Sequence, residues 1–327
     1  MIINQHRKFT PTNIFFVCVI GTLLCAGVFL HLPEELNPVF FEPAVHNLLG
    51  LAIEIRLAPA TNVLVTLVLT LLQAFFLNKV ISHFNFFNKP NFLTALMYMS
   101  LVSLLLPFLV LSPTLICNFI AIWMLSKLFN IYKQTDVKGL MFDLGIIVAI
   151  GSLIYFPFIV MVLLLWIALI IFRPFIWREW ITPLLGFLNV YFLIGVVYYW
   201  LDRFEEFKAI FSPFNNPIPT SLPLDYLDYI VLIPLGIGLL FFLSILKDQY
   251  FRSVVHIRKS FQLLFYMLVL IIASFYLNET ININHFLLCA PPLAIYLAYY
   301  FTYAKTKWLY ESLYLLIIGT ILYLQLI

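Results

Sequence analysis

Residues 140–172, LMFDLGIIVAIGSLIYFPFIVMVLLLWIALIIF, decide the fold, because this long apolar run contains a single charged residue, Asp143. The dipeptide Phe156-Pro157 divides the run and predicts a tight turn. In lipid, only helices and closed barrels satisfy the backbone hydrogen bonds, and barrel strands alternate apolar and polar residues, which this run does not. The stretch therefore predicts a helical hairpin inside a membrane.

The whole chain shares this composition. Of its 327 residues, 64% are hydrophobic and 10% are charged, whereas soluble domains average about half and about a quarter. A soluble fold of this size could not hide so much apolar surface, and a disordered chain needs far more charge. We therefore expect an all-α, polytopic transmembrane helix bundle that forms a single integral membrane domain over residues 1–327.

Windows of about 20 apolar residues, the length that crosses a bilayer, predict about eleven spans. They are 13–31, 59–79, 92–111, 113–128, 140–155, 157–172, 182–200, 228–246, 261–277, 285–303 and 309–326. The short span 113–128 follows a tight turn at Ser112-Pro113-Thr114, so it also forms a hairpin with the span before it.

The distribution of charge predicts the orientation. With the N-terminus in the cytoplasm, the outside loops keep only three of the 18 Lys and Arg residues, namely Arg56, Arg203 and Lys208. All other basic residues fall in inside loops, as the positive-inside rule requires. A missed span would invert every later loop, so this agreement supports both the span count and the cytoplasmic N-terminus.

Two outside segments, 32–58 and 201–227, are long enough to be partly ordered. In the first, Glu34, Glu35 and Glu42 predict an acidic mouth at the outer surface. Apolar walls beside a carboxyl group raise its pKa and suit it to catalysis. The alternative is that these three acids are solvated loop residues.

His46 and Arg56 interrupt the apolar stretch that follows this mouth, a pattern typical of a helix lying in the membrane interface. The second segment contributes Arg203 and several acids, which either add to the same mouth or belong to an ordinary solvated loop. We predict that His46, Arg56, Arg203 and Glu42 contact a substrate.

The run Arg173-Pro-Phe-Ile-Trp177-Arg178-Glu-Trp is the densest cluster of functional side chains on the inside. Two interpretations remain open for Arg173, Trp177 and Arg178. The arginines could grip a lipid phosphate or contact a partner, or the cluster could be an interfacial anchor, for which Trp and Arg are the usual residues.

Other chemistry has little support in the sequence. No nucleotide-binding loop, nucleophile elbow or zinc-protease motif is present. No histidine pair has ligand spacing with a carboxylate, so no metal site is predicted. Nucleic-acid binding is not expected, because the basic residues are spread one loop at a time. The cysteines lie in apolar runs and are expected to pack as small hydrophobic residues: Cys18, Cys25, Cys117 and Cys289.

The layout of one span, an acidic outside loop with a surface helix, and short hairpinned spans resembles the GT-C superfamily of polytopic glycosyltransferases. The stretch 142–157, with Gly145 and Gly151, is similar to a glycine-spaced hairpin of that superfamily. The resemblance implies transfer of a sugar from a polyprenyl-phosphate carrier at the outer face. It also implies that Glu34 or Glu35 acts as general base or holds a divalent cation.

The run from Arg173 also resembles an uncharacterised bacterial multi-pass membrane protein family, which implies the bacterial inner membrane. A rival interpretation is a non-catalytic subunit or scaffold of an envelope complex, whose partners are other membrane subunits. A lipid or small-solute transporter is a third, for which the sequence shows no ionisable group clearly at mid-depth.

Overall fold

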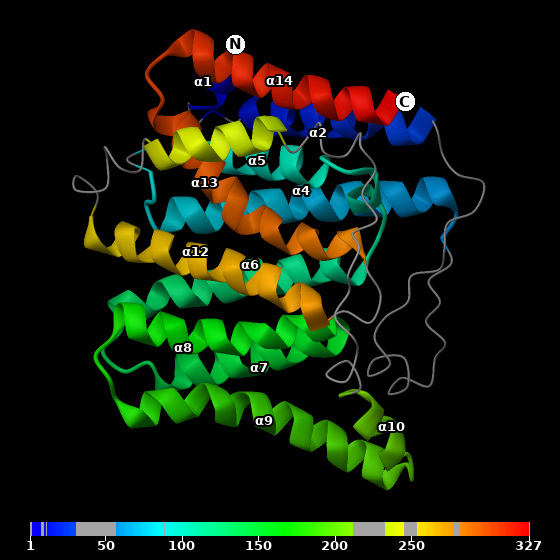
Figure 1. The fold of residues 1–327 in the computed structure, drawn as a ribbon, viewed down its shortest axis with the longest axis vertical. Helices are drawn as coiled ribbons and strands as arrows, with labels where there is room; N and C mark the ends of the chain where they lie inside the picture. Colours follow the sequence, from blue (N-terminus) through cyan, green and yellow to red (C-terminus); the bar gives the residue numbers. More distant parts are fainter. Residues whose placement is uncertain are drawn as a thin grey trace.

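The computed structural model describes residues 2–7, 10, 12–30, 57–87, 89–211, 233–244, 254–277 and 282–326, and every regular element in these ranges is helical. The helices lie side by side in a stacked bundle with their axes in broadly the same direction (Figure 1). An all-α bundle is therefore confirmed. Its apolar surface includes many large side chains, as a lipid-facing surface does.

Seven helical segments are long and apolar enough to cross a membrane. They are α2 (Thr12–Leu30), α4 (Pro59–His83), α6 (Pro113–Asn130), α9 (Trp177–Trp200), α12 (Val255–Ser274) with η5 (Phe275–Leu277), η6 (Ile283–Cys289) with α13 (Ala290–Tyr303), and α14 (Lys307–Leu326). A multi-pass membrane protein follows from these helices.

The remaining elements are shorter. They are α1 (Ile2–His6), α5 (Leu93–Val102), η1 (Leu106–Leu109), η2 (Ile131–Lys133), α7 (Lys138–Ile154), η3 (Phe156–Val160), α8 (Met161–Phe172), α10 (Phe204–Ala209) and the apolar helix Ile233–Ser244. Each predicted span thus overlaps a helix, but several helices are too short to count as spans by length alone. The total of eleven and the cytoplasmic N-terminus remain predictions.

The hairpin predicted at 140–172 is present as α7, η3 and α8, and the first helix ends before Pro157 because proline lacks the N–H that would extend it. Asp143 lies on the surface of α7, where its carboxylate contacts the Lys127 ammonium at 2.6 Å. Both side chains are partly exposed on the surface of the bundle, and the pair neutralises the one charged residue of the hairpin.

The two ends of the bundle carry different loops (Figure 1). One end, which we call the α10 end, holds α10, the last residues of α2 and the start of α4. The other end, which we call the basic end, holds the corners between α8 and α9 and between α13 and α14. Its basic residues include Lys138, Arg173, Arg178, Arg258 and Lys305.

The N-terminal segment docks at the basic end through polar contacts. The backbone N–H groups of Ile3 and Asn4 donate to the Glu311 carboxylate, at 3.4 and 3.2 Å. The Arg7 guanidinium donates to the carbonyl oxygens of Phe301 and Ala304, at 2.8 and 2.7 Å. These contacts fix α1 against the corner between α13 and α14.

Helix α9 lies at the edge of the bundle and crosses α7 at very close range. A Cβ added to Gly145 would overlap the Pro183 carbonyl oxygen, and a Cβ added to Gly186 would overlap the Phe142 carbonyl oxygen. Small residues at such a crossing let two backbones approach, which is a common way for helices to associate in lipid. The glycines of the predicted hairpin therefore serve helix packing.

Candidate functional site

The predicted acidic mouth (Glu34, Glu35 and Glu42) and the predicted substrate contacts His46 and Arg56 lie outside the described residues. The helices before and after this segment in the chain are α2 and α4. Helix α2 ends and helix α4 begins at the α10 end of the bundle (Figure 1). The chain therefore leaves and re-enters the described bundle at the end that also carries Arg203.

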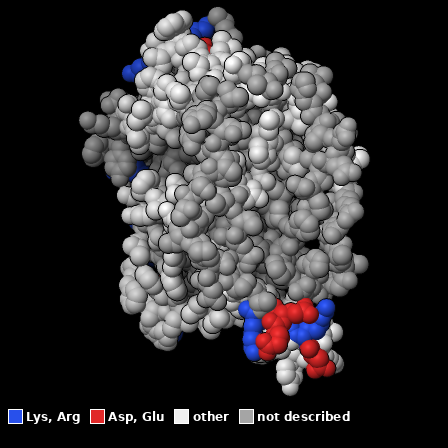
Figure 2. All heavy atoms as spheres, turned by 45° about the vertical axis from the view of Figure 1, so that its right-hand side comes forward, with Lys and Arg blue, Asp and Glu red and all other residues white. Residues whose placement is uncertain are grey.

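Arg203 directly precedes α10, next to a turn in which Asp202 has a φ of 54°. Its guanidinium contacts the Glu206 carboxylate at 2.9 Å, and Lys208 contacts Glu205 at 2.7 Å. These charges gather in one exposed patch (Figure 2). The two ion pairs in this patch neutralise each other's charges. A role of Arg203 in binding substrate stays a prediction.

Arg173 is held at the basic end by four hydrogen bonds within the described part of the chain. Its guanidinium donates to the carbonyl oxygens of Gln134 and Thr135, at 2.6 and 2.7 Å. The same group contacts the Glu179 carboxylate at 2.8 Å. The side chains of Arg173 and Glu179 are only 15% and 3% exposed, so this contact ties the start of α9 to the corner between α6 and α7.

Trp177 and Arg178 lie on the outer side of this corner. The Trp177 ring is 59% exposed, and the Arg178 guanidinium carbon lies 5.6 Å from its centroid. A stacked Trp–Arg pair fits a helix end that sits at the membrane interface. Contact of this pair with a lipid phosphate or a partner, and its role as an interfacial anchor, stay predictions.

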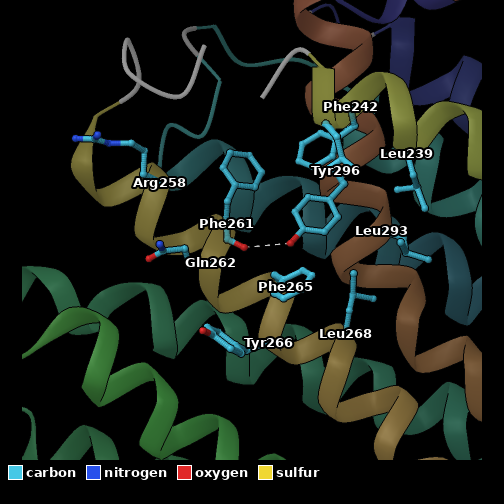
Figure 3. Close-up of a pocket in the computed structure, with 11 residues that line it drawn as sticks. Leu239, Phe242, Arg258, Phe261, Gln262, Phe265, Tyr266, Leu268, Leu293 and Tyr296 are labelled. Carbon is cyan, nitrogen blue, oxygen red and sulfur yellow. Dashed lines mark hydrogen bonds between the residues drawn. The ribbon is translucent and has the colours of Figure 1, made fainter. Parts of the chain in front are cut away.

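An apolar groove of about 470 Å³ lies between the helix Ile233–Ser244, α12 and α13. This volume lies within the range of about 300–1,000 Å³ that is usual for sites that bind small ligands. Its floor is aromatic: the Phe242 and Tyr296 rings stack with centroids 4.5 Å apart, and Phe261 lies 5.8 Å from Tyr296. The Tyr296 hydroxyl donates to the Phe261 carbonyl oxygen at 3.0 Å (Figure 3).

One edge of the groove is polar. Arg258, Gln262 and Tyr266 project to the same side of α12 from successive turns, whereas Phe265 and Leu268 face the apolar part (Figure 3). This spacing of four residues places side chains on one face of a helix. The groove therefore joins a polar edge to an apolar floor.

Neutral polar side chains are buried between α4, α5 and α6, where the sequence analysis found no clear site. The Asn62 side-chain oxygen accepts from the Leu111 N–H at 2.8 Å, between η1 and α6. Gln73 donates to the Leu115 carbonyl oxygen at 2.7 Å and accepts from the Tyr98 hydroxyl at 2.6 Å. These contacts supply hydrogen bonds to backbone groups in the first turn of α6 and just before it, and buried polar groups in a membrane need such partners.

Two further buried side chains, Asn118 and His285, also hydrogen-bond backbone groups. Asn118 donates to the carbonyl oxygen of Leu287 in η6 at 3.1 Å. One ring nitrogen of His285 lies 2.7 Å from the Ile271 carbonyl oxygen in the last turn of α12, and the other lies 2.8 Å from the Tyr155 hydroxyl. Single polar residues within apolar runs were the only sequence signal for these positions, and they do not reveal which backbone group each one serves.

The fold defines a polytopic α-helical membrane protein, and the groove is a candidate site on it. The chain belongs to a family of unknown function, DUF6427, which matches residues 45–327. No curated protein and no solved structure matches the chain. The family match assigns no chemistry and gives no support to the GT-C resemblance, and the multi-pass architecture rests on the apolar helices. Within the described residues no group of three or more His, Cys, Asp or Glu side chains is placed to hold a metal ion.

Proposed function

We propose that the protein is a membrane-embedded glycosyltransferase that takes a sugar from a polyprenyl-phosphate carrier at the α10 end. The observation that carries the proposal is the position of α2 and α4, the helices that come before and after the acid-bearing segment in the chain. Helix α2 ends and helix α4 begins at the same end of the bundle as α10, and the opposite end holds most of the described basic residues (Figure 1). Under the positive-inside rule the α10 end faces outward.

The reaction follows from the chemistry of the proposed residues. Glu34 or Glu35 takes the proton of an acceptor hydroxyl, and the hydroxyl oxygen then attacks the anomeric carbon of the sugar. The bond from that carbon to the carrier phosphate breaks, and the phosphate leaves with the electron pair. Arg56 or Arg203 stabilises the phosphate charge, while Glu42 and His46 orient the sugar.

The test is a transfer assay with the full-length protein in vesicles, using a radiolabelled polyprenyl-phosphate sugar. We expect Glu34→Gln combined with Glu35→Gln to lower transfer by at least about 100-fold, the usual scale for loss of a general base. Glu205→Gln is the matched control, because Glu205 is an exposed acid at the same end and forms an ion pair with Lys208. Unchanged transfer in the double variant, with normal expression, would remove the proposal.

A second candidate is a non-catalytic subunit or scaffold of an envelope complex, and the outer part of α9 favours it. Phe192, Tyr199 and Trp200 are 68%, 73% and 85% exposed. Large aromatic side chains are enriched in protein interfaces as well as at membrane surfaces. Mild detergent extraction followed by native mass spectrometry tests this candidate: a stable complex that Trp200→Ala dissolves supports it, and a lone chain contradicts it.

A transporter has no comparable support. The buried polar groups Asn62, Gln73 and Asn118 are neutral, and each one hydrogen-bonds a backbone group. These hydrogen bonds to the backbone account for the burial of the three side chains.

A further inference from the structure

We infer that the groove between the helix Ile233–Ser244, α12 and α13 binds an anionic glycerophospholipid from the leaflet at the basic end. Its acyl chain lies on the aromatic floor, and its phosphate meets Arg258. This inference goes beyond glycosyl transfer, because it concerns a different lipid at the opposite end of the bundle. It holds whether or not the transfer activity exists.

The length of the groove matches one leaflet. Helix α12 starts at the basic end and runs into the bundle, and the groove follows it from Arg258 to Leu268 (Figures 1 and 3). Ten residues of helix rise about 15 Å, which is half of the roughly 30 Å hydrocarbon core. A lipid whose headgroup lies at the level of Arg258 would thus end its chain near the bottom of the groove.

The chemistry changes along the groove in the order that a phospholipid requires. Arg258 is at the interface end and is a cation suited to a phosphate oxygen. Gln262, one turn further in, is exposed along the groove, and its amide can donate to an ester carbonyl of the lipid. The ester groups of a phospholipid lie just below its phosphate, so their order matches that of Arg258 and Gln262 along α12.

Below these two residues the lining becomes apolar. Phe265, Leu268 and Leu293 line the inner part of the groove, and the Tyr296 hydroxyl of the floor is already bonded to the Phe261 carbonyl oxygen. The inner part therefore offers a dry surface of fixed aromatic rings, which fits a hydrocarbon chain. The charge at one end favours an anionic lipid over a protein helix as the occupant.

The experiment uses full-length protein that has been delipidated in detergent and mixed with phosphatidylglycerol or phosphatidylcholine. Native mass spectrometry measures the bound lipid. We expect the wild-type protein to prefer phosphatidylglycerol. Arg258→Gln should weaken phosphatidylglycerol binding about fivefold, the effect of losing about 1 kcal/mol from one basic contact. It should weaken phosphatidylcholine binding less, because the choline cation of that lipid already offsets its phosphate charge.

Matched variants separate the headgroup from the chain. Lys305→Gln removes an exposed cation at the same end outside the groove and should have no effect on either lipid. Leu243→Trp places bulk at the rim of the groove and should reduce binding of both lipids, whereas Leu240→Trp, on the same helix but outside the lining, should reduce neither. Both leucines are more than half exposed, so folding should persist in each variant.

Three results would overturn the inference. Equal binding of the two lipids by the wild-type protein would show that the headgroup charge is not recognised. Equal effects of Leu243→Trp and Leu240→Trp would place the chain outside the groove. A lipid-free dimer that Leu243→Trp dissociates would make the groove an interface between two copies of the chain.

Discussion

Helix α9 and helix α4 are both long and apolar, yet they are attached to their neighbours by different chemistry. Helix α9 crosses α7 through Gly145 and Gly186, where the two backbones nearly touch, and a buried ion pair fixes its start. Helix α4 instead inserts Asn62 and Gln73 between α5 and α6, where both side chains bond backbone groups. Because lipid tails are as apolar as the helices, association in a membrane depends on such close packing and hydrogen bonding.

The largest expected effect concerns the ion pair at the start of α9. Replacing Arg173 by Gln leaves the buried Glu179 carboxylate without its cation and removes donors from two carbonyl oxygens. We expect the free energy of unfolding in detergent to fall by about 3–5 kcal/mol. The control is Lys138→Gln, which breaks an exposed pair with Asp136 and should change it by less than about 1 kcal/mol. Similar losses in both variants would show that the buried Arg173–Glu179 ion pair contributes no more to the free energy of unfolding than the exposed Lys138–Asp136 pair.

The glycine crossing should respond next most strongly. A methyl group at position 145 overlaps the Pro183 carbonyl oxygen, so Gly145→Ala must push α9 away from α7. The expected loss of unfolding free energy is about 1–3 kcal/mol, as for other overpacked sites. Gly139→Ala, in the same helix but with open space around the added methyl, should be neutral or stabilising. If thermal unfolding does not distinguish these two variants, the close approach is not important for stability.

A smaller effect is expected where hydrogen bonds join the helices. Tyr98→Phe removes the hydroxyl that donates to Gln73 and keeps the ring. We expect a loss of about 0.6–1.7 kcal/mol, the range measured for hydrogen bonds between membrane helices. A double-mutant cycle with Gln73→Leu isolates the pair. A coupling free energy near zero would argue that the polar contacts around α4 do not add stability.

The smallest effect is expected at α1, which is attached by polar contacts outside the spans. Burial lowers the pKa of His6 from its ordinary value of 6.5, although a hydrogen bond to the Ile2 carbonyl and the nearby Glu311 oppose the shift. The docked state therefore binds the proton less readily than the undocked state. Docking of α1 keeps its full stability above the ordinary His6 pKa of 6.5 and weakens as the pH falls below 6.5. Hydrogen exchange of residues 2–7 at about pH 7.5 and about pH 5 measures the difference. The difference should disappear in His6→Gln; if it persists, another group is responsible.

The sequence predicted the all-α membrane bundle and the hairpin around Pro157 because composition and proline chemistry act locally. It could not predict the partners of Arg173, since the carbonyl groups of Gln134 and Thr135 lie almost forty residues away and carry no side-chain signal. The groove was missed for a related reason. Arg258, Gln262 and Tyr266 look like scattered polar residues until α13 and the helix Ile233–Ser244 pack beside them.

The interrupted helices have a consequence for biogenesis. Helix α5 has ten residues and rises only about 15 Å, so a translocation channel cannot release it into lipid as an independent stable segment. Asn62 is synthesised before the Leu111 N–H that it accepts from, and Asn118 before the Leu287 carbonyl oxygen to which it donates. Earlier helices are thus already in place when the later, incomplete ones emerge, and partition into the bilayer proceeds by groups of helices in the order of translation.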